Sequence, residues 1–592
     1  MMAGACPYRD RAGPRFGALL RWGVALIWLV LAGTAVAATP GNGPGTPPAA
    51  AVASAHPLAT RAGMEVLAEG GNAFDAAVAV SAALAVVEPY SSGLGGGGFW
   101  LLHRAADGKD VMIDGRERAP LAATRTLFQD KNGKVVPGRS INGALAAGIP
   151  GEPAALVHIA RRYGRLSLAR DLAPAIRYAR DGFTVDPRYR SLARFRLSVL
   201  SRFPDAAKVF LRNGQVPPVG SRIVQPDLAG TLEAIAAHGR DGFYSGPVAR
   251  RLVAAVRAAG GIWTRKDLAQ YKVVERAPIQ GTYRGIHVVS AAPPSSGGIG
   301  LVEMLNVLSG YPLARLGPAD RDHLIIEAMR RAYRDRAEYL GDPDFVTMPV
   351  GRLLSPDYAA GLRASIRMDR ATRSDTLPGI AEHGDGPDTT HFSILDTEGN
   401  RVAATITINY PFGSCLLAPG TGVLLNDEMD DFSSKPGVPN VYGLVGGDAN
   451  AIGPGKRPLS SMTPTFLESD RGVAVLGTPG GSRIITMVLL ATLDFAAGHG
   501  PQHWVNLRRF HHQYLPDEVQ YEPGAFTLKT LKSLQARGHR LKALDHTYGN
   551  MQAVFWDRLH QRVEAASDPR GVGRATVAVP GATAAGGHRR AD

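Results

Sequence analysis

Two threonines stand where a polar, glycine-rich loop meets a pair of strand-like segments. Thr389 and Thr390 follow residues 374–388, which show no hydrophobic periodicity. Residues 392–396 and 402–408 are rich in apolar and β-branched side chains around a short polar turn, and this pattern predicts a β-hairpin. A threonine hydroxyl can serve as a nucleophile when a base lies beside it. Taken locally, however, the pattern is that of an ordinary loop before a strand.

Further polar motifs follow the threonine pair along the chain. They are residues 426–433, 435–440, 456–464 and 477–483. Together with Thr389-Thr390-His391 they resemble, in order and spacing, the γ-glutamyltranspeptidase family. The resemblance extends from about residue 50 to about residue 570. It depends on five ordered motifs, because no single tetrapeptide carries it.

The resemblance implies both a fold and a division of the chain. Family members have the N-terminal-nucleophile hydrolase fold, an α+β architecture in which two stacked β-sheets lie between helical layers (αββα). They are precursors that cut themselves, here between Asp388 and Thr389. Residues 38–388 would then be a large subunit and residues 389–592 a small catalytic subunit, together forming one intertwined domain.

Elementary chemistry gives a reason for the cut. An interior threonine has only an amide nitrogen, which is not basic, whereas a freed α-amine has a reference pKa of about 7.7–8.0. Burial lowers that pKa, so the amine can accept the hydroxyl proton near neutral pH. Cleavage would therefore create a nucleophile and its base from Thr389 alone. Before cleavage, the same hydroxyl would attack the preceding carbonyl.

The resemblance also assigns partners to the nucleophile. Thr407 matches a second threonine whose hydroxyl is thought to bond to the nucleophile, although on its own it is an ordinary strand residue. Asn409 has the same strand parity, so its side chain is expected on the same face and is assigned to substrate binding. Gly480 and Gly481 match the oxyanion hole, where glycine allows two N–H groups to point at one oxygen.

A second set of residues is expected to bind the head group of an α-amino acid. Arg116 matches the arginine that holds the substrate α-carboxylate, for which a guanidinium has a fixed charge and a bidentate fork. Glu428 and Asp431 match the acceptors of the α-amine, since two acids balance a cation that is costly to desolvate. Ser460 and Ser461 match a carboxylate-binding pair. In some family members the position of Glu428 is a glutamine.

Two further features concern the site: a loop that resembles a lid, and a segment that departs from the family pattern. Residues 436–447 resemble a loop that covers the active site in many members, with Tyr442 as its gate. A closed pocket of this kind favours small, glutathione-sized substrates. The chain departs from the family around Tyr410-Pro411 and Cys415, which leaves the choice of acceptor open.

The implied reaction is a ping-pong acyl transfer with no metal and no cofactor. Thr389 would take the γ-glutamyl group of glutathione or a related donor and pass it to water, an amino acid or a peptide. A glutaryl-cephalosporin-type acylase on the same fold is one alternative, although the α-amino-acid residues argue against it. An unprocessed periplasmic binding protein is another, against which the intact Thr389, Thr407 and glycine pair argue.

The elements that must position these residues follow from periodicity and capping signals. Strands are expected at residues 99–103, 110–115 and 281–290. Helices are expected at residues 57–69, 73–87 (capped by Asn72), 168–181, 227–237, 246–259, 299–308 and 320–340. In the last helix Arg330, Arg331, Arg334 and Arg336 alternate with acids, which predicts a solvated face.

The glycine run at residues 91–98 satisfies the spacing of a dinucleotide-binding loop. That motif needs a strand before it and a helix after it, whereas here a helix precedes and a strand follows. Close packing of the backbone is therefore the preferred interpretation. Adjacent His511 and His512 would point to opposite faces of a strand and so cannot easily share a metal ion.

The chain ends differ from its body. Four arginines, an apolar run and Ala35-Val36-Ala37 identify residues 1–37 as a secretory signal peptide, with an uncleaved anchor as the alternative. Periplasmic or secreted localisation without a stable membrane span follows. Residues 39–55 are expected to be disordered and residues 571–592 to fray.

Cysteine content and charge exclude other classes. Cys6 lies in the signal peptide, so the mature chain holds Cys415 alone and cannot form an internal disulfide; a buried structural role is expected. The net charge of +14 is modest for 592 residues. No basic block is interleaved with aromatic residues, so no nucleic-acid partner is expected.

Overall fold

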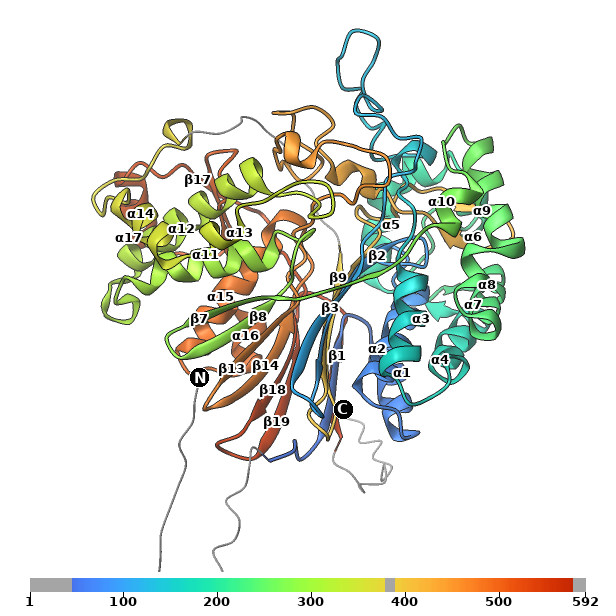
Figure 1. The fold of residues 1–592 in the computed structure, drawn as a ribbon, viewed down its shortest axis with the longest axis horizontal. Coiled ribbons are helices and arrows are strands. Elements are labelled where there is room, and N and C mark those ends of the chain that lie inside the picture. Colours follow the sequence, from blue (N-terminus) through green and yellow to red (C-terminus); the bar gives the residue numbers. More distant parts are fainter. Residues whose placement is uncertain (1–44, 378–388, 579–592) are drawn as a thin grey trace, which may run out of the picture. The chain divides into compact units, whose positions relative to one another are not determined.

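Strand β9 (Thr390–Leu395) begins directly after Thr389 and lies inside a seven-stranded sheet of the computed structural model, which describes residues 45–377 and 389–578. It pairs antiparallel with β1 on one side and β10 on the other (Figure 1). The sheet has the order β20 (Arg574–Ala578), β1 (Ala50–Ser54), β9, β10 (Arg401–Thr407), β2 (Gly97–Arg104), β3 (Lys109–Gly115) and β6 (Val274–Arg276).

A second, six-stranded sheet stacks on the first, with β14 packed against β9 and β10. Its order is β19 (Arg562–Ser567), β18 (Gln552–Asp557), β14 (Gly472–Gly477), β13 (Thr465–Ser469), β8 (Ile286–Ser290) and β7 (Ile279–Tyr283). Each sheet thus combines strands that precede Thr389 with strands that follow it. A cut before Thr389 would leave the two products sharing both sheets.

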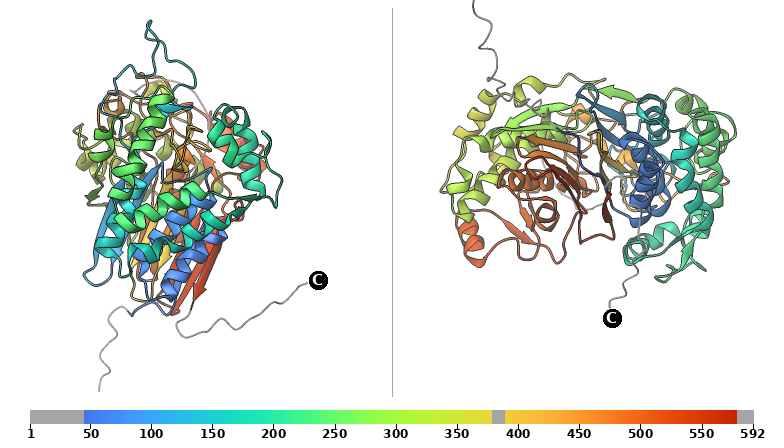
Figure 2. Two further views of the ribbon diagram at one scale, coloured as in Figure 1. Left: turned by 90° about the vertical axis from the view of Figure 1, so that its right-hand side faces the viewer. Right: turned by 90° about the horizontal axis from the view of Figure 1, so that it is seen from below.

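Helices cover the outer face of each sheet (Figure 2). Those on the first sheet are α1 (Pro57–Ala68), α2 (Ala73–Val87), α3 (Glu152–Tyr163), α4 (Leu168–Asp181), α5 (Pro187–Leu200), α6 (Pro204–Phe210), α7 (Pro226–His238), α8 (Asp241–Tyr244), α9 (Gly246–Ala258) and α10 (Arg265–Ala269). Those on the second are α11 (Gly297–Ser309), α12 (Pro318–Tyr339), α13 (Val350–Leu353), α14 (Pro356–Ala364), α15 (Ile484–Ala496), α16 (Pro501–Asn506) and α17 (Leu528–Ala536).

The residues of β2 explain this layering. Trp100 and Leu102 pack into the cluster under α1–α10, whereas Phe99 and Leu101 point the other way, into the layer between the sheets. Successive side chains of a strand face opposite sides, so a strand covered on both faces is apolar at nearly every position. The αββα sandwich expected from the sequence is confirmed.

Local signals predicted most elements well. Helix α2 occupies the expected residues 73–87, and Asn72 caps it in a box with Asp75, whose carboxylate accepts the Asn72 N–H. The hairpin of β9 and β10 forms with the register Leu395 to Arg401. Its turn is fixed by the Asp396 carboxylate, which accepts the N–H groups of Glu398 and Asn400.

The single strand expected at residues 281–290 is wrong, because the chain forms the hairpin β7–β8 there. Arg284 and Gly285 have φ of 50° and 81°, the left-handed pair of a tight hairpin turn. A glycine after a long polar residue is a weak signal for such a turn, so the sequence pattern predicts one continuous strand.

Two end segments expected to lack structure form strands. Residues 50–54 make β1, which is buried between β9 and β20. Residues 574–578 make β20, which pairs with β1 along its whole length. Alanine-rich strands carry little β propensity of their own, and both form through pairing with neighbours remote in sequence. Residues 1–44 and 579–592, which include the expected signal peptide, lie outside the described residues.

The solvated face expected on α12 is also wrong. Arg330, Arg331 and Arg336 are at most 5% exposed. The Arg331 guanidinium pairs with Glu327 at 2.6 Å, and Arg330 pairs with Asp517. Buried charges need such partners. In this helix Glu327 and Asp335 are buried with the arginines and neutralise an interior layer, whereas Glu338 near its end is exposed.

The glycine run at residues 91–98 serves close packing, as expected. A side chain at Gly95, Gly96 or Gly98 would overlap backbone atoms of the strands and loops after Thr389, among them the carbonyl oxygens of Leu424 and Thr407. The run therefore lets β2 lie directly beside the segments that carry the candidate site.

The remaining strands are short, and they are β4 (Phe183–Thr184), β5 (Arg222–Ile223), β11 (Leu417–Ala418), β12 (Val423–Leu424), β15 (Phe510–His511), β16 (Val519–Tyr521) and β17 (Leu541–Ala543).

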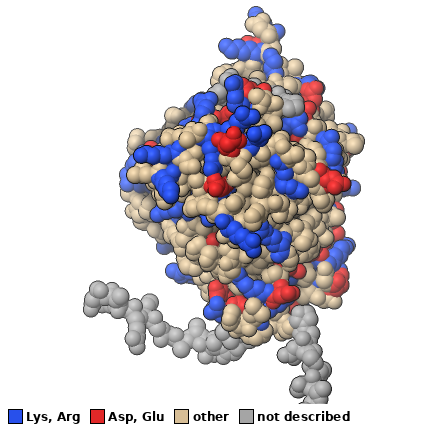
Figure 3. All heavy atoms as spheres, turned by 90° about the vertical axis from the view of Figure 1, so that its left-hand side faces the viewer, with Lys and Arg blue, Asp and Glu red and all other residues tan. Residues whose placement is uncertain are grey.

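Among residues 45–377 and 389–578, none of the helices combines the length and the apolar content needed to span a bilayer. On the face shown in Figure 3, lysine and arginine side chains lie in small groups with acidic side chains among them. The expectation of no nucleic-acid partner stays a prediction.

Candidate active site

Thr389 lies at the end of the first sheet and is only 6% exposed. Two residues later, the His391 ring packs directly on Gly477, the last residue of β14 in the other sheet. Because Gly477 has no side chain, the sheets approach closely here and bring the turn after β14 to Thr389. Burial lowers the His391 pKa to about 3, so this ring stays neutral and is no base for the threonine.

The expected oxyanion glycines form that turn. Gly480 and Gly481 have φ of 142° and 56°, values that other residues rarely adopt. Gly481 opens a single 3-10 turn (Gly481–Arg483) that runs directly into α15. The N-terminus of a helix presents N–H groups and a partial positive charge, which favours an anion. The turn can therefore stabilise an oxyanion next to Thr389.

Thr407 and Asn409, at the end of β10, line the same cavity as Thr389. The Asn409 N–H donates to Thr407 Oγ1 at 2.7 Å, and Asn409 Nδ2 donates to the Asp427 carbonyl at 3.0 Å. Asn409 has a left-handed φ of 75°, which turns the chain away from the sheet. The structure thus brings both residues to the site, while the hydrogen bond between Thr407 and the nucleophile remains a prediction.

Arg116 forms a buried ion cluster. Its guanidinium donates to Glu428 and, at 2.5 Å, to Asp431 Oδ2, and it lies 3.7 Å from Glu117. Burial raises the pKa of Glu428 and of Asp431, and the attraction of Arg116 opposes the shift. Within the described part of the chain, Glu428 Oε2 and both Glu117 oxygens have no hydrogen-bond partner. The cluster is therefore rich in acceptors and suits a further cation.

The serine pair is held by a residue that sequence reasoning missed. Arg336 of α12 donates to Ser461 Oγ at 3.3 Å and to Ser296 Oγ at 2.9 Å. Ser296 in turn donates through its N–H and its hydroxyl to the Ser460 carbonyl. Arg336 lies in a charge-rich helix whose pattern indicates a solvated face, so no sequence signal marked it.

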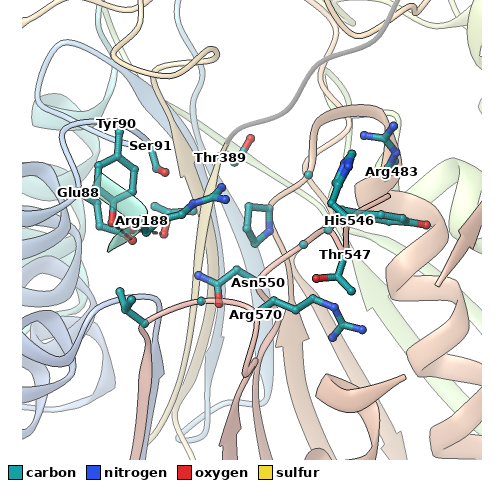
Figure 4. A pocket seen from close by; sticks show the side chains of 17 residues that line it. Glu88, Tyr90, Ser91, Arg188, Thr389, Arg483, His546, Thr547, Asn550 and Arg570 are labelled. Carbon is teal, nitrogen blue, oxygen red and sulfur yellow. Dashed lines mark hydrogen bonds between the residues drawn. The ribbon is translucent and has the colours of Figure 1, made fainter. Parts of the chain in front are cut away.

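One cavity unites the expected residues. It is lined by Arg116, Thr389, Thr407, Asn409, Glu428, Asp431, Tyr442, Leu444, Ser460, Ser461, Met462, Gly481 and Ile484. Gly480 lines a neighbouring cavity that also contains Thr389 (Figure 4). Asp388, the expected residue before the cut, lies outside the described residues. The three apolar residues Leu444, Met462 and Ile484 were not expected.

The loop of residues 436–447 contributes Tyr442 and Leu444 to the wall of this cavity. The Tyr442 ring lies against Gly481, where even one added carbon would overlap it. Its hydroxyl donates to the Asn409 carbonyl at 2.7 Å, and its carbonyl accepts from Gln513 Nε2 at 3.2 Å. Tyr442 thus connects the loop to the ends of β10 and β14, the arrangement expected of a gate.

Removing the Tyr442 hydroxyl should loosen the lid. A net hydrogen bond contributes about 0.5–1.5 kcal/mol, so Tyr442→Phe should raise the open population about two- to tenfold. Limited proteolysis, which follows that population when closing is fast, should cut within residues 436–447 faster by the same factor. Tyr521→Phe, whose ring packs on Phe526 outside the cavity, is the control. Equal rates for Tyr442→Phe and wild type would exclude the gate.

The other residues singled out in the sequence take structural positions. His511 bonds to Thr486 and Gln513, whereas His512 bonds to Asp517, so the two rings have separate partners. Cys415 is buried, and burial raises its thiol pKa to about 11, which makes it a poor nucleophile.

Two groups in the described residues combine histidines with an acid, and neither lines the cavity. They are His323, Glu327 and His539, and Asp494, His499 and His503. The Glu327 carboxylate is already held by Arg330 and Arg331. The expectation of no metal stays a prediction.

An αββα sandwich with a threonine at the head of an inner strand and a glycine turn beside it defines an N-terminal-nucleophile hydrolase. Comparison with known proteins makes the assignment specific: the family model of gamma-glutamyltranspeptidase matches residues 59–578. The chain belongs to this family of enzymes.

Individual relatives and solved structures agree with this family assignment. The chain is 48% identical over 499 residues to a glutathione hydrolase proenzyme of Pseudomonas sp. (strain A14), covering 83% of this chain and 86% of the relative. A cephalosporin acylase from Bacillus halodurans superposes with a TM-score of 0.79 at 29% identity, over 90% of this chain and 96% of that chain. A chain of the Helicobacter pylori gamma-glutamyltranspeptidase superposes at 0.54 and 42% identity, over 55% and 94%.

Proposed function

We propose that the chain is a precursor that cleaves itself before Thr389 and then transfers γ-glutamyl groups. The donor is glutathione or a related γ-glutamyl compound, and the acceptor is water, an amino acid or a peptide. Thr389 is the nucleophile and its freed amine is the base. The names of the relatives, which include glutathione hydrolase proenzyme, support both the processing and the donor.

The observation that carries the proposal is the ion cluster beside Thr389. A γ-glutamyl donor presents an α-carboxylate and an α-ammonium at the end remote from the scissile bond. Arg116, Ser460 and Ser461 supply cationic and hydroxyl donors for the carboxylate. Glu428 and Asp431 supply acceptors for the ammonium, and Glu428 Oε2 is a buried oxygen without a partner among the described residues.

The cycle uses these groups in a definite order. The Thr389 hydroxyl attacks the γ-carbonyl carbon and gives its proton to the α-amine. The N–H groups at Gly480 and Gly481 stabilise the oxyanion, and the leaving amine departs with that proton. Water or an acceptor amine then attacks the threonine ester and regenerates the hydroxyl. Tyr442 closes the cavity during these steps.

Donor binding should depend on the ionisation of Glu428. Burial raises its pKa, so the carboxyl becomes neutral as the pH falls through that raised value and can no longer balance an ammonium. The amine of Thr389 also titrates, but it is common to wild type and Glu428→Gln. The kcat/KM of wild type divided by that of Glu428→Gln should therefore increase as the pH is raised from about 6 to about 9. Steady-state kinetics across this range measures it, and a flat ratio contradicts the role of Glu428.

The acylase relative defines the competing function, because a glutaryl group lacks the α-ammonium. The two activities are separated by comparing the release of p-nitroaniline from γ-glutamyl-p-nitroanilide and from glutaryl-p-nitroanilide. The acidic pair should make the first substrate better by at least about tenfold, since an uncompensated buried acid disfavours the second. A preference for the glutaryl compound would overturn the proposal in favour of the acylase.

The mass of the purified chains tests both the cleavage before Thr389 and the removal of the signal peptide. An intact-mass spectrum of the purified protein should show a chain of residues 389–592 and a larger partner that starts near residue 38. We propose export to the periplasm or medium, for which residues 1–37 supply the sequence signal. A single uncut chain would favour the binding-protein alternative.

A further inference from the structure

Two histidines and one aspartate meet at the surface where α15 ends and α16 begins (Figure 1). Asp494 lies in the last turn of α15, His499 in the connecting loop and His503 in the first turn of α16. Their ligand atoms all lie within 4.8 Å of one another. Helix α16 packs on α15 and on β18 and β19, so the second sheet supports the elements that carry this group.

Both imidazole rings are directed at the same carboxylate. His499 Nδ1 lies 2.8 Å from Asp494 Oδ1, and His503 Nδ1 lies 2.6 Å from Asp494 Oδ2. The two rings stack with their centroids 4.1 Å apart and their planes at 29°. Two positively charged rings stacked this closely would repel each other, so the arrangement suits neutral imidazoles. A neutral imidazole is the form that binds a metal ion.

This set of ligand atoms fits a small transition-metal ion. Zn²⁺ accepts imidazole nitrogens and carboxylate oxygens at about 2.0–2.2 Å, and a water molecule can complete its tetrahedron. Ligand atoms around such an ion are about 3.3 Å apart, which is wider than the two hydrogen-bonded distances to Asp494. The side chains of His499 and His503 are 49% and 53% exposed, so both rings have room to move apart and admit the ion.

Binding of the ion needs no further reactant. In each neutral ring the Nδ1 proton moves to Nε2 by exchange with solvent, which frees the Nδ1 lone pair for the metal. The Asp494 carboxylate then accepts the cation in place of the two N–H groups. No covalent bond to carbon changes and no electron is transferred.

The charges around the group also allow a cation. The C-terminal end of a helix carries a partial negative charge, and Asp494 lies in the last turn of α15. Glu564, which pairs with Arg562, lies close to Gly500, where its Oε2 would be 2.9 Å from an added carbon. The guanidinium of Arg471 is directed at two main-chain carbonyl groups. The surroundings are therefore close to neutral, and the affinity comes from the three ligands.

We propose that Asp494, His499 and His503 bind one zinc ion, which joins the end of α15 to the start of α16. The role of the ion is structural, because Asp494 lies about 15 Å along α15 from Ile484 of the active-site cavity. The catalytic cycle proposed above needs no metal and does not depend on this site. The inference therefore goes beyond the proposed function.

The test titrates Zn²⁺ into the processed enzyme, purified without a histidine tag and freed of metal with EDTA, by isothermal titration calorimetry. Wild type should bind one Zn²⁺ per molecule. His503→Gln removes one of the three ligands and Asp494→Asn removes the negative charge, so each should weaken binding at least about tenfold. Mg²⁺ should not bind, because it prefers sites made of oxygen ligands.

His560→Gln is the matched control. His560 is exposed and lies 2.7 Å from Asp557, and this pair belongs to neither group of possible metal ligands in the described residues. The control should keep the wild-type affinity. In thermal unfolding, excess Zn²⁺ should raise the Tm of wild type and of His560→Gln but not that of His503→Gln. Equal zinc affinity in wild type and His503→Gln, or no zinc binding by wild type, would overturn the inference.

Discussion

Thr389→Ala should yield a single uncut chain without transferase or hydrolase activity. The variant lacks the hydroxyl that would attack the preceding carbonyl, so neither the free amine nor the nucleophile forms. Removal of a catalytic nucleophile lowers kcat by about 10⁴-fold or more. The substitution removes only a hydroxyl and a methyl group from a residue that is 6% exposed, so the fold should persist.

Two measurements separate the parts of this expectation. Intact mass reports cleavage, and release of p-nitroaniline from γ-glutamyl-p-nitroanilide reports catalysis. Thr389→Ser keeps a hydroxyl and should still cleave, more slowly, which shows that the position tolerates a change. The neighbouring hydroxyl of Thr390 is engaged by Glu88, so it cannot substitute for the missing one. Normal cleavage of Thr389→Ala would refute the assignment.

The individual elements could be predicted because their signals are local. Asn72 and Asp75 mark the start of α2, and the polar turn at residues 397–400 between two runs of apolar and β-branched residues marks a hairpin. Strand β1 could not be predicted in this way, since its five residues are alanine, valine and serine and it exists through pairing with β9 and β20. Long-range pairing leaves little trace in the local sequence.

The members of the site followed from ordered motifs, whereas their mutual arrangement did not. Arg116 and Glu428 are more than three hundred residues apart, and the sequence could not reveal that the guanidinium and this carboxylate form an ion pair in the folded chain. The charge pattern predicts a solvated face for Arg336, because helical charge alternation is the same for a surface and for a buried ion layer. Only the packing of α12 against the serine loop distinguishes the two.

Arg116→Ala is expected to have the second large effect, and for two reasons. The donor loses the guanidinium that would bind its α-carboxylate. In addition, Glu428 and Asp431 lose the cation that opposes the rise of their pKa values, so both become protonated more easily and bind the α-ammonium poorly. Loss of one partner of a buried ion pair costs about 2–5 kcal/mol, which corresponds to about 30-fold to a few thousandfold in kcat/KM.

The change should appear mainly in KM, because the head group lies away from the reacting carbon. Arg116→Lys should be intermediate, since a lysine keeps the charge and loses the bidentate geometry. Arg401→Ala is the matched control: Arg401 is equally buried and ion-paired, with Glu468, but it lies at the opposite end of β10. That variant should lose stability without a comparable rise in donor KM. An unchanged donor KM in Arg116→Ala would contradict the assignment of Arg116 to the α-carboxylate of the donor.

A double-mutant cycle resolves the two causes. If Arg116 acts partly by keeping Glu428 ionised, the effects of Arg116→Ala and Glu428→Gln on kcat/KM overlap, and the double variant is less impaired than the product of the single effects. If Arg116 acts only through the donor carboxylate, the effects multiply. The direct contact between the two side chains in the structure favours the first outcome. The substrate ammonium and the Arg116 guanidinium then share one set of buried acids, so both ends of the head group are recognised by a single electrostatic unit.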